Sequence, residues 1–327
     1  MQSPAIAGRT NLGVLTHFMK PLDVLRWIAL GLFSAASLCA QSAPRAEHVF
    51  IISFDQAGND SIAKAEMPLF KAMAAQGAHT WEAYTIVPSL TLPSHVSMLT
   101  GVGIQKHQIL WNDWNPNRPK LSVPTIFQLA RARGLTTALI AAKDKFKTFQ
   151  QAGGQDIFMI PENAKAAGIA ASVAGVLKKQ QPNLFFIHFA DPDTTGHKYG
   201  VDSPEKMHAL ADCDQALKVI CEAITAAGIA STSVMILTSD HGGHNRTSEE
   251  VAERIKRGEE PQLGTHGAPD SSDVLIPWIA SGKGVKPGFT ITAPVIQYDT
   301  AATALWLLGV PVPESFWGRP VTSAFLE

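Results

Sequence analysis

The chain has 327 residues, of which 46% are hydrophobic and 17% are charged, and its formal net charge is −1. A chain of this length and composition can bury a sizeable core, so we expect a globular protein. There is no surplus of Lys and Arg to neutralise phosphates, and we therefore expect no nucleic-acid-binding surface.

The N-terminal segment has the pattern of a secretory signal. Lys20 and Arg26 precede an apolar run over residues 27–40, and a run of about 14 residues is shorter than the about 20 that a membrane span needs. We expect cleavage after Ala40, with Met19 as an alternative start, which leaves one domain over 41–327 and no membrane span. The pattern predicts a secreted or periplasmic protein, and an uncleaved N-terminal anchor is the alternative.

Three segments are unbroken apolar runs that end in aspartate, namely HVFIISFD (48–55), NLFFIHFADPD (183–193) and SVMILTSDH (233–241). Such runs predict strands covered on both faces, which is typical of a parallel sheet between helices. We expect two further strands at 135–142 and 275–282, and crossover helices at 64–76, 124–133, 165–179 and 205–227. The predicted fold class is α/β, with a mostly parallel central sheet sandwiched between helices.

Two cysteines of the mature chain lie on one predicted helix. Cys213 and Cys221 are eight residues apart, and about 12 Å along a helix is too far for a disulfide. We expect two buried thiols.

Thr91 lies in a constrained turn before another predicted helix. Pro88 and Pro93 fix the backbone on both sides of it. The helix is expected from Pro93 to Gly101, and its first turn offers unpaired N–H groups to an anion held at the Thr91 hydroxyl. Thr91 is thus a candidate nucleophile, although from this stretch alone an N-cap threonine that only closes the helix is the favoured interpretation.

Histidines accompany the strand-end aspartates in the motifs DPDTTGH, SDHGG and GTHGAP. The candidate ligands are Asp55, Asp193, His197, Asp240, His241 and His266. Aspartate oxygen and histidine nitrogen suit Zn²⁺ at about 2.0–2.2 Å, and six such residues are too many for one tetrahedral ion with an open position. The sequence therefore predicts two metal ions.

These motifs, with TLPSH…LTG around Thr91 and Asn112 in HQILWN, resemble the nucleotide pyrophosphatase/phosphodiesterase branch of the alkaline phosphatase superfamily. The resemblance covers about residues 47 to 325. It implies an alkaline-phosphatase-like fold and a zinc-dependent hydrolase that acts on small phosphate esters, by preference phosphodiesters or nucleotide pyrophosphates.

The resemblance also implies roles for individual residues. One zinc would be held by Asp55, Asp240 and His241 with Thr91 as its reacting ligand, and the other by Asp193, His197 and His266. Thr91 would attack phosphorus and form a phosphothreonine, which water then cleaves. Asn112 and the Leu92 N–H would hold charge on the transferred group.

Several positions bear on the substrate. The family often has an aromatic residue after the nucleophile, where this chain has Leu92, which leaves nucleotide preference open. Trp111 and Trp114 would supply an aromatic wall or belong to a packed surface loop. Only the 24 residues 242–265 separate His241 from His266, which leaves no room for a large capping subdomain and predicts an open pocket.

The segment AAKDKFK carries Lys143 and Lys145 after a predicted strand. Some phosphomonoesterases of the superfamily have a Lys-x-Arg pair in a similar segment that binds the extra phosphate charge, which makes both lysines candidate substrate-binding residues. A solvated surface run is the alternative, and we favour it here. We interpret His95 and His244 as supporting or structural residues rather than ligands.

A phosphomonoesterase on the same core is the alternative function. A non-catalytic metal-dependent binding protein would require a missing ligand or nucleophile, and none is missing from the sequence.

Overall fold

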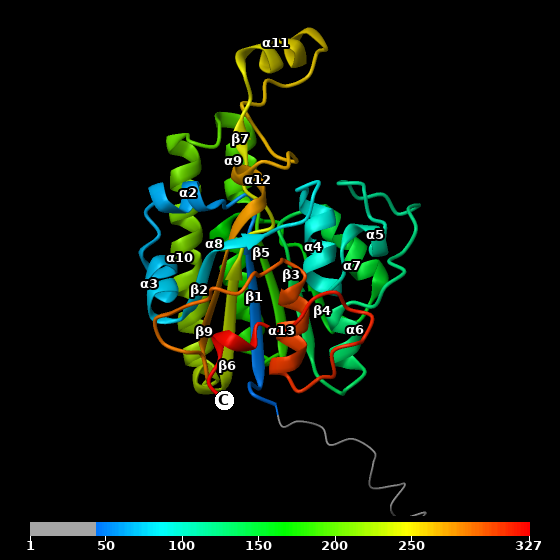
Figure 1. Cartoon of the computed structure of the whole chain (residues 1–327), viewed down its shortest axis with the longest axis vertical. Helices are drawn as coiled ribbons and strands as arrows, with labels where there is room; N and C mark the ends of the chain where they lie inside the picture. The colour runs from blue at the N-terminus through cyan, green and yellow to red at the C-terminus, as the bar shows by residue number, and fades with distance from the viewer. Residues whose placement is uncertain (1–43) are drawn as a thin grey trace, which may run out of the picture. The chain divides into compact units, whose positions relative to one another are not determined.

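One eight-stranded sheet organises residues 44–327, the part of the chain that the computed structural model describes (Figure 1). The strand order is β10-β2-β9-β6-β1-β5-β3-β4. Strand β9 is antiparallel to its neighbours β2 and β6, and the other pairs in this sheet are parallel. The prediction of a mostly parallel sheet between helices is therefore confirmed. The expected signal at 1–40 lies outside the described residues.

The strands of the large sheet are β1 (His48–Phe54), β2 (Ala78–Tyr84), β3 (Thr137–Ile140), β4 (Ile157–Met159), β5 (Leu184–Phe189), β6 (Ser233–Thr238), β9 (Leu275–Gly282) and β10 (Phe289–Thr290). A two-stranded sheet pairs β7 (His244–Asn245) with β8 (Gly264–Thr265). The α-helices are α2 (Asn59–Lys64), α3 (Pro68–Gln76), α4 (Thr91–Thr100), α5 (Ile104–His107), α6 (Ile126–Arg131), α7 (Lys147–Ala152), α8 (Ala166–Leu177), α9 (Asp191–Tyr199), α10 (Pro204–Ala226), α11 (Ser248–Lys256), α12 (Ser271–Val274) and α13 (Asp299–Leu307). Short 3₁₀ turns are η1 (Asp144–Phe146), η2 (Ala230–Thr232) and η3 (Thr322–Ala324).

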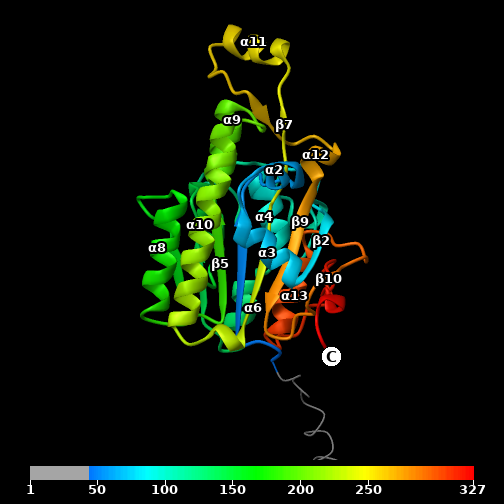
Figure 2. The same ribbon diagram turned by 90° about the vertical axis from the view of Figure 1, so that its left-hand side faces the viewer.

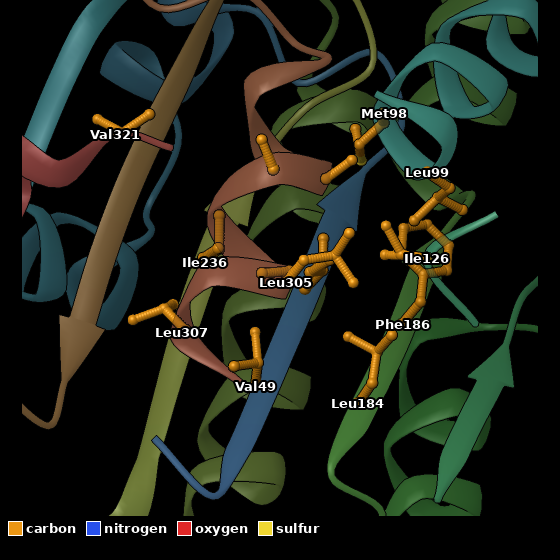
Figure 3. Close-up of a cluster of buried hydrophobic side chains, with 14 of the residues drawn as sticks. Val49, Met98, Leu99, Ile126, Leu184, Phe186, Ile236, Leu305, Leu307 and Val321 are labelled. Carbon is orange, nitrogen blue, oxygen red and sulfur yellow. The ribbon is translucent and has the colours of Figure 1, made fainter. Parts of the chain in front are cut away.

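Successive residues of the central strands enter two different cores. In β1, Val49 and Ile51 pack with side chains of α4, α6 and α13 (Figure 3), whereas Phe50 and Ile52 pack with side chains of α3, α8 and α10. Figures 1 and 2 show these two sets of helices on opposite faces of the sheet. Burial on both faces is why the strand sequences are unbroken apolar runs.

The helix expected at 64–76 is two helices. Pro68 is the first residue of α3, and the chain between α2 and α3 is not helical. Proline has no backbone N–H and its ring clashes with the preceding turn, so one helix cannot run through this position.

Two strands differ from the sequence-based expectation. Strand β2 was not expected, because its residues alternate between buried and partly exposed instead of forming an apolar run. The expected strand at 275–282 is present as β9 with these bounds, but it runs antiparallel between β2 and β6.

Helix α10 carries both remaining cysteines. Cys213 is buried and Cys221 is partly buried, and both are free thiols, as their spacing predicted. Although α10 has 23 residues, no helix within residues 44–327 is both long and apolar enough to cross a membrane.

Candidate metal centre and nucleophile

The three predicted metal-binding aspartates lie at one edge of the sheet. Asp55 directly follows β1, Asp193 lies in the first turn of α9 after β5, and Asp240 follows β6. Because β5, β1 and β6 are neighbouring parallel strands, their carboxyl ends meet at this edge. It is the edge from which β7 and α11 project in Figure 1.

The six predicted ligands form two groups. The Asp55 group consists of Asp55, Asp240 and His241, and the Asp193 group consists of Asp193, His197 and His266. Within each group, the atoms that would bind a metal lie within 4.8 Å of one another. The structure therefore brings together the two sets that the resemblance implied.

The three histidines of these groups present the same ring nitrogen. The Nδ1 atoms of His197, His241 and His266 each donate to a backbone carbonyl, at 3.1, 2.9 and 2.8 Å respectively. Because a carbonyl only accepts, Nδ1 carries the proton and Nε2 keeps its lone pair. Each Nε2 lies between 3.2 and 3.5 Å from a carboxylate oxygen of its own group.

In each of the three aspartates, one carboxylate oxygen accepts hydrogen bonds and the other does not. Asp55 Oδ1, Asp193 Oδ1 and Asp240 Oδ2 are buried without a hydrogen-bond partner, and these are the oxygens nearest to the histidine Nε2 atoms. A buried acceptor without a donor is costly, and here such oxygens face nitrogen lone pairs. A divalent cation satisfies both kinds of atom at once, so the residues fit two cations.

Burial controls protonation of the histidines and of Asp240. It lowers the pKa of His241 well below its usual range and also lowers the pKa of His266, which favours the neutral rings that a metal requires. Burial opposes the charge of His197 as well, but Asp193 outweighs it and the pKa of His197 is raised. Burial, together with the Asp55 carboxylate, raises the pKa of Asp240 well above its usual range.

Thr91 is the first residue of α4, and its hydroxyl faces the Asp55 group. Its Oγ1 lies 3.3 Å from His241 Nε2. The N-cap position of α4 belongs to Leu90 and has no side-chain cap, so the N-cap interpretation of Thr91 is wrong. The helix begins two residues before the expected Pro93 because proline is compatible with a first helical turn. Its last residue is Thr100, and the C-cap residue Gly101 has a φ of 69°.

Asn112 contacts two other predicted substrate-binding residues. Its Oδ1 accepts from the Leu92 N–H at 2.9 Å and from Lys145 Nζ at 2.9 Å. The Leu92 N–H was expected to hold charge on the transferred phosphate group. In the structure it instead donates to Asn112 and holds that side chain in place. With Oδ1 engaged by two donors, the Nδ2 amide is the part of Asn112 that remains to donate.

The interpretation of Lys143 and Lys145 as a solvated surface run is wrong. The Lys143 side chain is 17% exposed, and its ammonium lies 2.5 Å from both Asp55 Oδ2 and Asp193 Oδ2. Lys145 is also partly buried, and burial, aided by the charge of Lys143, lowers its pKa. Strand β3 places this segment beside β5, close to the ends of β5 and β1.

Three supporting residues were missed by the sequence analysis. His188 Nδ1 accepts from the Ala142 N–H at 3.4 Å, so its Nε2 donates to Asp55 Oδ2 at 3.0 Å. Gln56 donates its N–H to Asp240 Oδ1, and the ammonium of Lys206 donates to Gln56. A histidine inside the apolar run LFFIHF was the available signal for His188, whereas Gln56 and Lys206 lie in ordinary sequence contexts.

The other singled-out side chains support the fold around the site. His95 is buried, donates to the Thr91 carbonyl at 2.7 Å and accepts from Ser53. His244 pairs with Asp273 at 2.8 Å. Trp111 packs against the core and lies under Arg118, which matches the packed-loop alternative, and Trp114 is partly buried.

Residues 242–265, which separate the predicted ligands His241 and His266, form a projecting arm rather than a cap. The arm contains β7, α11 and β8, and no residue of α11 is buried. Figures 1 and 2 show α11 extending away from the sheet. This arrangement agrees with the expected absence of a large capping subdomain from the described residues.

A family model described as type I phosphodiesterase / nucleotide pyrophosphatase matches residues 49–257. Human ectonucleotide pyrophosphatase/phosphodiesterase family member 5 is 26% identical over 227 residues, which are 64% of this chain and 48% of that protein. Human family member 7 is 25% identical over 248 residues, 68% of this chain and 54% of that protein. The chain thus spans about half the length of these relatives.

A solved structure shows the same fold. It is that of an inactive variant of murine ectonucleotide pyrophosphatase/phosphodiesterase 5 in complex with AMP, with a TM-score of 0.69 and 18% identity. The match covers 86% of this chain and 100% of that one.

Proposed function

Because the chain belongs to the type I phosphodiesterase / nucleotide pyrophosphatase family, we propose that it is a two-metal phosphoric ester hydrolase that acts through a phosphothreonine at Thr91. The observation that carries this proposal is the position of the Thr91 hydroxyl, 3.3 Å from His241 Nε2 at the first residue of α4. A buried hydroxyl beside a ligand group is the arrangement that a metal-activated nucleophile requires.

The Asp55 group and the Asp193 group would each hold one divalent cation, with zinc as the proposed metal. When bound, the two cations would act as Lewis acids that stabilise the threonine alkoxide and the leaving oxygen. The carboxylates and the neutral histidine Nε2 atoms supply the donors, and the backbone carbonyls on Nδ1 keep the rings oriented.

The remaining residues act directly on the phosphate ester. Thr91 Oγ1 gives up its proton to water and bonds to phosphorus while the bond to the leaving oxygen breaks, and the leaving group departs as an alkoxide that takes a proton from water. Asn112 Nδ2 donates to a phosphate oxygen, and the Leu92 N–H and Lys145 hold the amide in that orientation. Water then cleaves the phosphothreonine and restores the hydroxyl.

We propose phosphodiesters or nucleotide pyrophosphates as substrates. A phosphomonoesterase is the second candidate, because Lys145 places a positive charge beside Asn112, and a monoester carries one more negative charge than a diester. One purified sample should be assayed on an aryl diester, an aryl monoester and an aryl sulfate. Faster diester hydrolysis, with a phosphate on the Thr91 peptide after acid quenching, supports the proposal. Faster monoester hydrolysis promotes the second candidate, and no phosphate ester hydrolysis refutes both.

We further propose that residues 41–327 form a single exported domain and that the protein works outside the cytoplasm. The N-terminal pattern supports this, as does the similarity to human ectonucleotide pyrophosphatase/phosphodiesterase family members 5 and 7.

A further inference from the structure

Lys143 touches both ligand groups at once. It lies between β3 and η1, and its ammonium is 2.5 Å from Asp55 Oδ2 in one group and 2.5 Å from Asp193 Oδ2 in the other. These are short, charge-assisted contacts made by a side chain that is 17% exposed.

The two aspartates depend on this lysine to different degrees. Asp55 Oδ2 also accepts from His188 Nε2 at 3.0 Å. For Asp193, Lys143 is the hydrogen-bond donor that the described residues provide, and it binds Oδ2 only. The other oxygen, Asp193 Oδ1, is thereby directed toward His197 Nε2 at 3.3 Å and His266 Nε2 at 3.5 Å.

We propose that Lys143 is a positioning residue that joins the two ligand groups and sets which oxygen of each aspartate faces its metal. The inference rests on the proposed function, because it assumes that the groups hold cations. Two carboxylates that share one ammonium cannot rotate independently, and both then present a single oxygen to their histidines. Since its contacts are to the aspartates, Lys143 is assigned to the ligands and Lys145, beside Asn112, to the substrate.

Whether replacing Lys143 strengthens or weakens metal binding distinguishes a positioning role from a purely electrostatic effect of its charge. An ammonium repels a nearby dication, so removal of its charge alone would tighten metal binding at both groups. Loss of a partner that orients a ligand weakens metal binding, typically by about 10–100-fold. Positioning therefore predicts weaker binding, and mainly at the Asp193 group, because His188 still holds Asp55 when the lysine is gone.

The test measures zinc affinity at one group at a time. His241→Ala would leave the Asp193 group, and His197→Ala would leave the Asp55 group. Zinc is titrated by calorimetry into each metal-depleted variant, with and without Lys143→Met. We expect Lys143→Met to weaken binding about 10-fold or more in the first background and less than about threefold in the second. Lys147→Met is the matched control, because Lys147 pairs with Asp144 on the surface, and it should leave both affinities unchanged.

Each other result has a defined meaning. Unchanged or tighter zinc binding with Lys143→Met would overturn the inference while leaving the proposed function in place. A wild-type protein that binds no zinc would refute the proposed function and this inference together. If the methionine variant does not fold, as judged by circular dichroism, Lys143→Ala provides the same comparison, because it also removes both the charge and the hydrogen-bond donor.

Discussion

The imidazole rings of His241 and His266 lie face to face, with centroids 3.8 Å apart and planes 18° from parallel. The two rings belong to different ligand groups. The Asp55 group and the Asp193 group are therefore in direct contact through these stacked rings. In-line displacement between two metals requires two ligand groups that lie next to each other in this way.

The first prediction concerns metal content. Chelation should abolish hydrolysis, and about two zinc ions per chain should restore it, because each group offers its own aspartate and histidine donors. Metal analysis alongside an activity assay checks this. Full activity with one bound ion would contradict the two-metal proposal.

Thr91→Ala should remove nearly all turnover, by at least about 10³-fold in kcat, because the nucleophilic oxygen is lost. The aspartates and histidines remain, so two zinc ions should still bind. Thr91→Ser, which keeps a hydroxyl, should retain measurable turnover and serves as the control. An alanine variant with most of its kcat would show that Thr91 is not the nucleophile.

Lys145 should favour substrates with extra negative charge. Lys145→Ala should lower kcat/KM for an aryl monoester at least about 10-fold more than for an aryl diester, since one charged contact is worth about 1.5–3 kcal/mol. Lys147→Ala is the surface control and should change neither value beyond about twofold. Equal losses on both substrates would mean that Lys145 acts only by holding Asn112.

Lys206 should make the free energy of unfolding depend on pH in the alkaline range. Its side chain is fully buried, its ammonium donates to Gln56 O and Oε1 at 2.9 Å each, and burial lowers its pKa from 10.5 to about 8. Between pH values of about 8 and 10.5, Lys206 is protonated in the unfolded chain and mostly neutral in the folded one. Because the unfolded chain then binds more protons, the free energy of unfolding rises with pH over this range. The neutral amine still donates to both acceptors.

The measurement for Lys206 compares urea unfolding of the wild type and Lys206→Met from pH 7.5 to 10.5. The wild type should gain up to about 3 kcal/mol relative to the variant as pH rises, which is the upper limit set by a shift of this size. A difference that stays constant across this range would show that Lys206 does not titrate there.

Export can be checked on protein produced in its native host. N-terminal sequencing should find a mature chain that begins at or near Gln41, because the apolar run ends at Ala40. Soluble cytoplasmic protein that retains Met1 or Met19 would refute the export proposal.

The strand-end aspartates could be predicted from sequence for a local reason. An unbroken apolar run predicts a strand buried on both faces, and a polar residue directly after it marks the edge of the sheet. Asp55 directly follows β1, Asp240 follows β6 after one further polar residue, and the motif DPDTTGH places Asp193 and His197 on one helical face. Thr91 could be singled out because the flanking prolines restrict the backbone locally.

The tertiary structure decided the contacts that depend on which strands are neighbours. Lys143 reaches Asp55 and Asp193 only because β3 pairs with β5 and β5 pairs with β1, and nothing in AAKDKFK encodes that order. A lysine also has a flexible four-carbon stem, so its local sequence does not determine where its ammonium lies. The same holds for Lys206, which is 150 residues from Gln56 in the chain. The hydrophobic periodicity of a sequence indicates which face of a helix or strand is buried. The contact partners of Lys143 and Lys206, in contrast, are determined by long-range packing.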